Sequence, residues 1–330
     1  MIMVQQGGFY TLETHSRPVR GRFAPSPTGR MHLGNLFCAL LAWLFAKKQG
    51  GAMVLRLEDL DPARSRPEYA RLLEEDLDWL GLTWDEGGSR GGPYSPYYQS
   101  QATALYEEAL ARLRRVATIY PCFCSRDQLR AAGAPHAGDG SLPYPGTCRS
   151  LSPEEVAERG TLRRPALRIR VPEQMISFVD GHLGSYGENL AQSCGDFILR
   201  RSDGAFAYQL AVVVDDARMA VTQVVRGRDL LSSTPRQLWL YSLLGLTPPN
   251  FIHVPLLLAA DGRRLSKRER DLDMAALRRR FTPPELLGRL AYLAQLQAAP
   301  DPVTPSQLLV SADLSRLPRK DLVVPEALFA

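Results

Sequence analysis

The feature that most constrains the fold is a strand-like segment that breaks sharply before a long apolar helix. The run RFAPSPTGRMHLGN covers residues 22–35, and the uncharged segment MHLGNLFCALLAWLFA covers residues 31–46. This segment is shorter than the ~20 apolar residues that a membrane helix needs, so we expect a buried core helix. The chain must therefore bury a long apolar helix that begins directly after a stiff turn.

The order of the predicted elements around this helix indicates an α/β fold. Residues 19–24 and 52–57 have the pattern of strands, and residues 32–48 have the length and composition of a helix. A second, amphipathic helix is expected from Pro67 to Gly81, with Ser65 as its cap. This β-α-β-α order is typical of a parallel sheet.

A segment with a different residue pattern divides this α/β pattern into two parts. From residue 117 to 195, short β-like runs alternate with Gly/Pro-rich loops, and helix–strand alternation resumes after a predicted hairpin turn at Asp203-Gly204. We therefore expect a Rossmann-like, doubly wound parallel sheet that is split by an inserted subdomain. The predicted parts are an N-terminal tail (1–16), the first half of the core (17–116), an inserted α+β subdomain (117–195), the second half of the core (196–260), and a loop with a short helical C-terminal region (261–330).

Composition excludes several classes of protein. With 45% hydrophobic and 23% charged residues, the chain is not of the disordered class. The first 16 residues contain no Lys or Arg and no long apolar stretch, so no signal peptide is expected and the predicted location is cytoplasmic. Five cysteines, an odd number, argue against a disulfide framework.

Positive charge is concentrated near the C-terminus. The chain has a net charge of +5, and residues 263–280 contain eight Lys/Arg against three Asp/Glu. Such a patch suits a polyanion such as nucleic acid. On charge alone, a solvated helix face explains it equally well.

The break after the first strand has the features of a nucleotide site. Pro25 and Pro27 stiffen the loop, Gly29 allows it to turn, and His32 and Gly34 fall at the start of the helix. A helix N-terminus attracts phosphate, and a histidine can donate a hydrogen bond to it. A simple turn with a capping histidine is the alternative.

A second motif, DGRRLSKR at residues 261–268, contains an unusual lysine. The chain has four lysines against 36 arginines, and Lys267 is the only lysine between residues 49 and 319. A compact, mobile ammonium suits a triphosphate that moves during reaction, whereas the planar fork of arginine would fix one geometry. An accidental surface lysine is the alternative.

Together these motifs resemble the signatures of class I aminoacyl-tRNA synthetases. PSPTGRMHLGN resembles their HIGH motif, and RLSKR at 264–268 resembles their KMSKS loop. RFAPSPTG, followed by RLEDLD at 56–61, is similar to the glutamyl branch. The resemblance implies that L-glutamate is activated by ATP, with Mg²⁺, as glutamyl-adenylate. His32 and Lys267 would be the catalytic residues that stabilise charge developing on the α-phosphate.

The resemblance also implies the residues of the pocket. Arg22 and Arg226 fall at predicted strand ends, where α/β proteins bind ligands, and a guanidinium binds a carboxylate bidentately. Taken singly, each could instead form an ordinary ion pair. The implied glutamate site consists of Arg22, Phe23, Ala24, Pro25, Ser26, Glu58, Tyr208 and Arg226, with Glu58 pairing with the α-ammonium group. The implied ATP site consists of Pro25, His32, Gly34, Asn35 and Lys267.

A cysteine cluster in the predicted insertion suggests a structural zinc ion. Cys122 and Cys124 form a tight pair, and Cys148 follows a glycine turn. Zinc needs four ligands, and His136 is the chemical candidate for the fourth. The resemblance implies Tyr144 instead, in the run YPGTC. Reduced thiols without a metal are the alternative.

The length of the chain separates two readings of the resemblance. Only 62 residues follow residue 268, too few for the large anticodon-binding domains of a full glutamyl-tRNA synthetase. Short members of the branch attach glutamate to queuosine at the wobble position of tRNA(Asp), and we expect this chain to act as such an enzyme and as a monomer. The alternatives are a truncated or partner-dependent synthetase that charges the 3′ end of tRNA(Glu), and a noncatalytic paralogue that binds RNA or an amino acid.

The substitution Lys267→Ala tests the role of the second motif. Because the ammonium would stabilise charge on the transferring phosphate, we expect glutamate-dependent ATP–pyrophosphate exchange to slow at least about tenfold, with glutamate affinity nearly unchanged. An unchanged exchange rate would refute this role.

Overall fold

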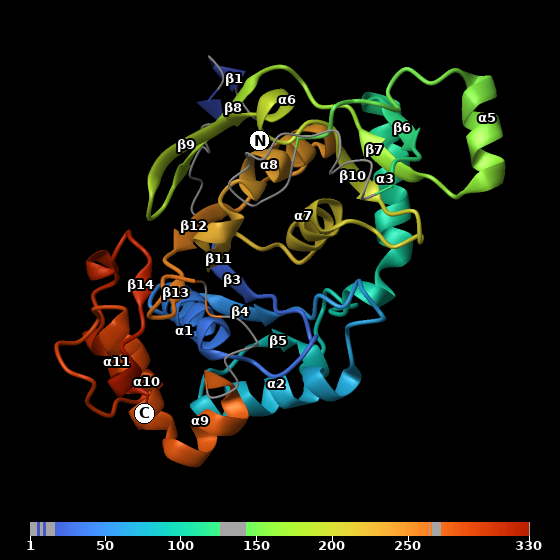
Figure 1. The fold of residues 1–330 in the computed structure, drawn as a ribbon. Coiled ribbons are helices and arrows are strands. Elements are labelled where there is room, and N and C mark those ends of the chain that lie inside the picture. The colour runs from blue at the N-terminus through green and yellow to red at the C-terminus, as the bar shows by residue number, and fades with distance from the viewer. Residues whose placement is uncertain are drawn as a thin grey trace.

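A five-stranded parallel sheet forms the centre of the protein (Figure 1). The computed structural model describes residues 5–6, 9–10, 17–125, 143–263, 265 and 272–329. Along the sheet the strands follow the order β12 (Asn250–Val254), β11 (Gln223–Gly227), β3 (Arg20–Phe23), β4 (Ala52–Leu55) and β5 (Glu86–Gly87). In chain order this is 3-2-1-4-5, the doubly wound arrangement. The predicted parallel α/β sheet is therefore confirmed.

The apolar helix α1 (Leu33–Lys47) packs directly on β3. Gly21 makes this close approach possible, because a Cβ at this position would lie 2.9 Å from the Cβ of Ala46. Helix α2 (Pro67–Leu80) belongs to the same apolar core. Its predicted cap, Ser65, is wrong: Arg66 is the N-cap, because a residue before proline is disfavoured in helical geometry.

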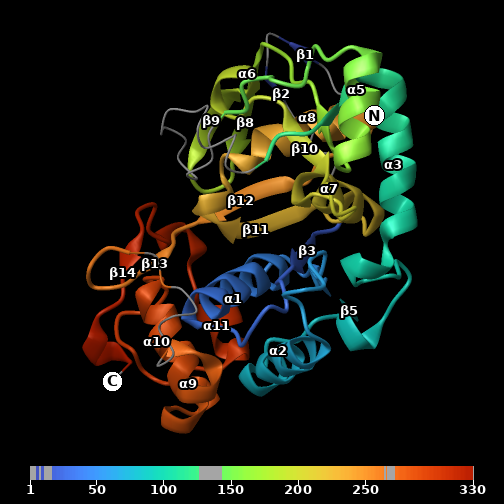
Figure 2. The same ribbon diagram turned by 45° about the vertical axis from the view of Figure 1, so that its right-hand side comes forward.

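Helices cover both faces of the sheet (Figure 2). Opposite α1 and α2 lie α7 (Tyr208–Arg218) and α8 (Ser233–Leu244), which share an apolar core with α3 (Thr103–Val116). In β11, Val224 belongs to this second core and Val225 to the core of α1, as the twofold alternation of a strand requires. The two apolar cores cover the faces of the sheet, so polar side chains can lie at the carboxyl ends of the strands.

Antiparallel strands occupy much of the chain between β5 and β11. One sheet has the order β10 (Phe197–Arg200), β7 (Ala166–Ile169), β6 (Ile119–Cys122). Another pairs β8 (Met175–Asp180) with β9 (Gly184–Asn189), and β1 (Gln5–Gln6) and β2 (Phe9–Tyr10) extend it, so part of the predicted tail is paired. Helices α5 (Pro153–Leu162) and α6 (Leu190–Ser193) lie in the same region. Because β10 pairs with β7, it does not join the parallel sheet. The predicted domain boundaries themselves stay predictions.

The C-terminal helices pack against α1 and α2 rather than forming a separate core. They are α9 (Met274–Arg280), α10 (Pro283–Leu293) and α11 (Pro305–Ser311), and the buried Leu286 and Leu290 of α10 share the core of α1. Strands β13 (Leu257–Leu258) and β14 (Leu322–Val323) pair beside them. Short 3₁₀ helices are η1 (Gly88–Arg90), η2 (Gln99–Gln101), η3 (Arg228–Leu230), η5 (Leu314–Arg316) and η6 (Glu326–Leu328). Within the described ranges, no helix combines the length and apolarity needed to cross a membrane.

Candidate functional site

The N-terminus of α1 is organised by His32. Its Nδ1 accepts a hydrogen bond from the backbone N–H of Gly34 at 3.1 Å, and the side chain of Asn35 accepts one from the backbone N–H of His32 at 3.2 Å. Because Nδ1 is an acceptor, the neutral imidazole carries its proton on Nε2. At Gly34 a Cβ would lie 3.1 Å from the imidazole ring, so a larger residue would press on His32. The capping geometry thus holds the ring with Nε2–H as its donor.

A cavity of about 160 Å³ lies beside this helix end. Its lining includes seven of the predicted site residues, namely Phe23, Ala24, Pro25, His32, Gly34, Asn35 and Arg226. Leu256, Leu257 and Leu265 supply an apolar wall. Ser26 is exposed on the same loop and is not among the lining residues. The cavity combines an apolar wall, a helix N-terminus and a buried cation, which suits a nucleotide.

Lys267 lies outside the described residues, but the residues that flank its segment lie at the cavity. Leu265 lines it and donates its N–H to the carbonyl of Leu257 at 3.1 Å. After the undescribed residues, Asp273 forms a β-bridge with His32, and Met274 donates its N–H to the carbonyl of Met31 at 2.9 Å. The segment that carries Lys267 therefore starts and ends beside the cavity.

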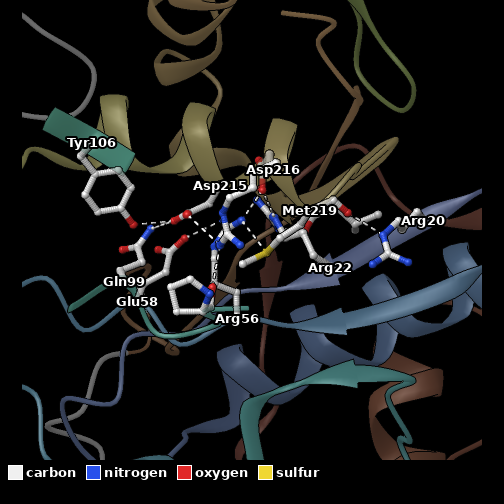
Figure 3. A network of polar contacts seen from close by, with 12 residues as sticks. Arg20, Arg22, Arg56, Glu58, Gln99, Tyr106, Asp215, Asp216 and Met219 are labelled. Carbon is white, nitrogen blue, oxygen red and sulfur yellow. Dashed lines mark hydrogen bonds and ion pairs between the residues drawn. The ribbon is translucent and has the colours of Figure 1, made fainter. Parts of the chain in front are cut away.

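Three arginines are buried together next to the cavity, and Figure 3 shows two of them with their acidic partners. Arg22 in β3 is 5% exposed, Arg226 in β11 is 4% exposed, and Arg56, directly after β4, is fully buried. Arg22 donates from Nη1 to the carbonyl of Val225 at 3.1 Å, and its Nε lies 3.7 Å from Asp216. Adjacent parallel strands bring these guanidinium groups to one end of the sheet.

Arg56 lies between two carboxylates. It donates to Asp216 through Nη1, and its Nη2 is 3.0 Å from Glu58. Glu58 is further fixed by its backbone N–H, which donates to the carbonyl of Pro25 at 3.0 Å. Burial raises the pKa of Glu58, and the positive charges of Arg56 and Arg22 oppose this rise. The structure thus places Glu58 at the junction of the Pro25 loop and the arginine group.

Arg226 keeps one nitrogen without a partner. Its Nε donates to Nε2 of His253 at 3.0 Å and its Nη2 donates to Thr234 at 2.8 Å, whereas Nη1 has no hydrogen-bond partner among the described residues. Burial lowers the pKa of Arg226, and the nearby Tyr208 at the start of α7 opposes this shift. An unpaired buried donor of this kind is costly unless a ligand completes it.

The cysteine cluster forms a separate site. The Sγ atoms of Cys122, Cys124 and Cys148 all lie within 4.8 Å of one another. The hydroxyl of Tyr144 is 3.5 Å from Sγ of Cys122 and 3.8 Å from that of Cys124. Arg168 donates to Sγ of Cys122 at 3.2 Å. Burial raises the pKa of Cys122, but hydrogen bonds from Tyr144 and Arg168 outweigh it and the pKa is lowered. The donor set fits a thiophilic ion. His136 lies outside the described residues.

Comparison with known proteins identifies the family. Residues 18–298 match the family described as tRNA synthetases class I (E and Q), catalytic domain. The chain belongs to this family. It is 52% identical to a glutamyl-Q tRNA(Asp) synthetase of Nitratidesulfovibrio vulgaris strain Hildenborough, covering 93% of this chain and 96% of that protein. A protein of the same name from Symbiobacterium thermophilum is 51% identical over 92% of this chain and 95% of its own length.

A solved structure of the family has the same fold. It is a glutamate tRNA ligase from Elizabethkingia meningosepticum in complex with its amino acid, with a TM-score of 0.80 and 29% identity. The match covers 95% of this chain and 68% of that one. The family thus includes longer chains, and this chain spans about two thirds of that relative.

Several site residues were not predicted from the sequence. Arg56 and Asp216 join the arginine group, and Thr234 and His253 hold Arg226. Arg56 is the first residue of the run RLEDLD and follows the apolar run AMVL, and Asp216 follows the apolar run LAVVV of α7 by two residues. A charged residue after an apolar run was therefore the sequence feature that could have indicated both. Nothing local marks Thr234 or His253, because their contacts join distant parts of the chain.

Two substitutions separate the capping role of His32 from its chemical role. Asparagine caps a helix well but lacks the Nε2–H donor, so His32→Asn should keep the thermal stability and slow glutamate-dependent ATP–pyrophosphate exchange at least about tenfold. His32→Ala should slow exchange similarly and also lose about 1 kcal/mol of stability. Full exchange activity in the asparagine variant would show that His32 acts only as a cap.

Proposed function

We propose that this protein is an ATP-dependent ligase that activates L-glutamate as glutamyl-adenylate and transfers the glutamyl group to queuosine at the wobble position of tRNA(Asp). The observation that carries the first step is the buried arginine group beside the cavity at α1. The transfer to queuosine is supported by the names of two relatives that this chain matches over nearly their whole length.

Charge complementarity supports glutamate as the amino acid. Glu58 and Asp216 pair directly with the guanidinium groups of Arg22 and Arg56, whereas the buried Asp215 pairs with Arg218 and the buried Asp180 with His253. Glutamate has a side-chain carboxylate that can pair with the remaining donors of these guanidinium groups, and glutamine lacks it. Glu58 would pair with the α-ammonium, and Tyr208 would add a hydroxyl contact. The full glutamate set proposed is Arg22, Phe23, Ala24, Pro25, Ser26, Glu58, Tyr208 and Arg226.

The proposed chemistry depends on position and charge. The α-carboxylate of glutamate attacks the α-phosphate of ATP and pyrophosphate leaves, so no side chain needs to act as a nucleophile. Nε2–H of His32 and the ammonium of Lys267 would stabilise the charge on the phosphate, with Pro25, Gly34 and Asn35 lining the ATP site. Mg²⁺, arriving with the triphosphate, would offset its negative charge.

Chain coverage supports queuosine tRNA as the acceptor. The chain covers 96% of a relative named glutamyl-Q tRNA(Asp) synthetase but 68% of a glutamate tRNA ligase. The two alternatives, a truncated enzyme for tRNA(Glu) and a noncatalytic paralogue, are therefore not favoured. The basic residues 263–280 would contact the tRNA backbone. We propose a monomer and a cytoplasmic location, where tRNA and ATP occur together.

We also propose that residues 117–195 form a zinc-bearing subdomain between the two halves of the core. Cys122, Cys124, Cys148 and Tyr144 would hold the ion, since all four donors converge. Three thiolates and a phenolate exceed the charge of Zn²⁺, and Arg168 lies 3.8 Å above the ring of Tyr144 and next to Cys122, where it offsets the excess. The ion would be structural, because four protein ligands leave no open position.

The acceptor is tested by labelling. Radiolabelled glutamate and ATP are supplied with tRNA(Asp) that contains or lacks queuosine, and with tRNA(Glu). We expect label only on queuosine-containing tRNA(Asp). Label at the 3′ end of tRNA(Glu) would support the truncated synthetase, and no label on any RNA would support the noncatalytic paralogue.

Metal analysis tests the zinc site. The purified protein should contain about one Zn²⁺ per chain, Cys122→Ser should lose it, and Tyr144→Phe should release it to a chelator at least about tenfold faster. Cys194→Ser, at a cysteine outside the cluster, serves as the matched control and should keep the metal. Unchanged metal retention in Tyr144→Phe would remove Tyr144 from the ligand set.

A further inference from the structure

Two buried residues behind Arg226 form a chain of hydrogen bonds that the proposed chemistry does not use. His253 in β12 is fully buried, and Asp180 at the end of β8 is 2% exposed. Nδ1 of His253 lies 2.6 Å from Oδ2 of Asp180, and Nε2 of His253 lies 3.0 Å from Nε of Arg226. The chain therefore runs from the carboxylate through the imidazole to the guanidinium.

The protonation of His253 fixes the direction of these hydrogen bonds. Burial lowers the pKa of His253 to about 4, and the positive charge of Arg226 adds to this, while the hydrogen bond to Asp180 opposes it. The ring is therefore neutral at neutral pH. Since Asp180 accepts from Nδ1–H, Nε2 is an acceptor, and it lies 3.0 Å from Nε of Arg226 and 3.3 Å from the hydroxyl of Thr234. An imidazolium could not accept that bond.

Packing prevents the imidazole from taking another orientation. The ring of Phe251 lies 6.3 Å from that of His253 in a stacked arrangement, and Phe178 lies 6.4 Å away. The hydroxyl of Thr234 accepts a hydrogen bond from Nη2 of Arg226 at 2.8 Å. The plane of the guanidinium is thus set by His253 and Thr234, with the carbonyl of Leu230 as a longer acceptor of Nη2 at 3.4 Å, and Nη1 remains as the donor without a partner among the described residues.

We propose that His253, oriented by Asp180, is a positioning residue that fixes Arg226 so that its Nη1 meets the side-chain carboxylate of glutamate. This inference rests on the proposed function. It adds a positioning element, because a guanidinium held in one plane presents its Nη1 to the carboxylate without reorienting on binding.

A matched pair of variants tests the proposal. In His253→Gln the amide oxygen reaches the position of Nε2 and can accept from Arg226, whereas in His253→Asn the amide lies near Nδ1, donates to Asp180 and leaves Nε of Arg226 without an acceptor. Both remove the ring and have similar polarity. In glutamate-dependent ATP–pyrophosphate exchange we expect His253→Asn to raise the KM for glutamate at least about tenfold, with the KM for ATP within about twofold of the wild type. His253→Gln should stay within about threefold for both substrates.

Four outcomes would overturn the proposal. The first is an equal rise in the glutamate KM of both variants, and the second is an equal rise for glutamate and ATP; each would indicate a purely structural role. If neither variant folds, as judged by thermal unfolding, Thr234→Val decides, because it removes the 2.8 Å acceptor of Nη2 and the 3.3 Å contact of the hydroxyl with Nε2 of His253, and leaves Nη2 only the carbonyl of Leu230 at 3.4 Å. A raised glutamate KM supports the proposal, and an unchanged one is the third outcome that overturns it. Fourth, if the wild type shows no glutamate-dependent exchange, the proposed function fails and the inference fails with it, a result distinct from the other three.

Discussion

The buried arginine group is the constraint on which the whole site depends. Arg22, Arg56 and Arg226 lie within the protein, Glu58 and Asp216 pair directly with Arg22 and Arg56, and Asp180 reaches Arg226 only through His253. Burying a charged donor without a partner costs free energy unless an anion completes the site. The order of the strands brings the three arginines together, because β4, β3 and β11 are neighbours and their carboxyl ends lie at the same edge of the sheet. The fold therefore keeps a buried donor, Nη1 of Arg226, without a partner among the described residues, and we propose that an anionic ligand completes it.

One loop joins this charged site to the cavity at α1. Residues 24–32 connect β3 to α1. The carbonyl of Pro25 accepts a hydrogen bond from the N–H of Glu58, and the carbonyl of Pro27 accepts one from the N–H of Arg66. Arg30 forms an ion pair with Asp76 of α2, which also pairs with Arg278 of α9. The loop is thus fixed at several points. In a reaction that needs no protein nucleophile, such fixed positioning of two substrates supplies much of the rate.

Sequence patterns predicted the parts of the site that local chemistry determines. The strand, the turn and the helix around His32 follow from proline, glycine and apolar runs, and Arg22 and Arg226 were found because they lie near strand ends. Contacts between distant segments could not be predicted. Arg56 meets Asp216 across 160 residues, and a charged side chain after a strand does not reveal its partner. The cap at Ser65 failed because the steric effect of Pro67 outweighs a preference for serine.

The segment between the two halves of the parallel sheet contacts the proposed amino-acid site through His253. Asp180 in β8 accepts from the backbone N–H groups of His182, Leu183 and His253 as well as from the imidazole of His253. A shift of the β8–β9 hairpin would break these bonds and leave a buried carboxylate without partners, which is costly. The same shift would release His253 and with it the plane of Arg226. The hairpin and the arginine group are therefore energetically coupled, and the antiparallel segment supports the proposed amino-acid site.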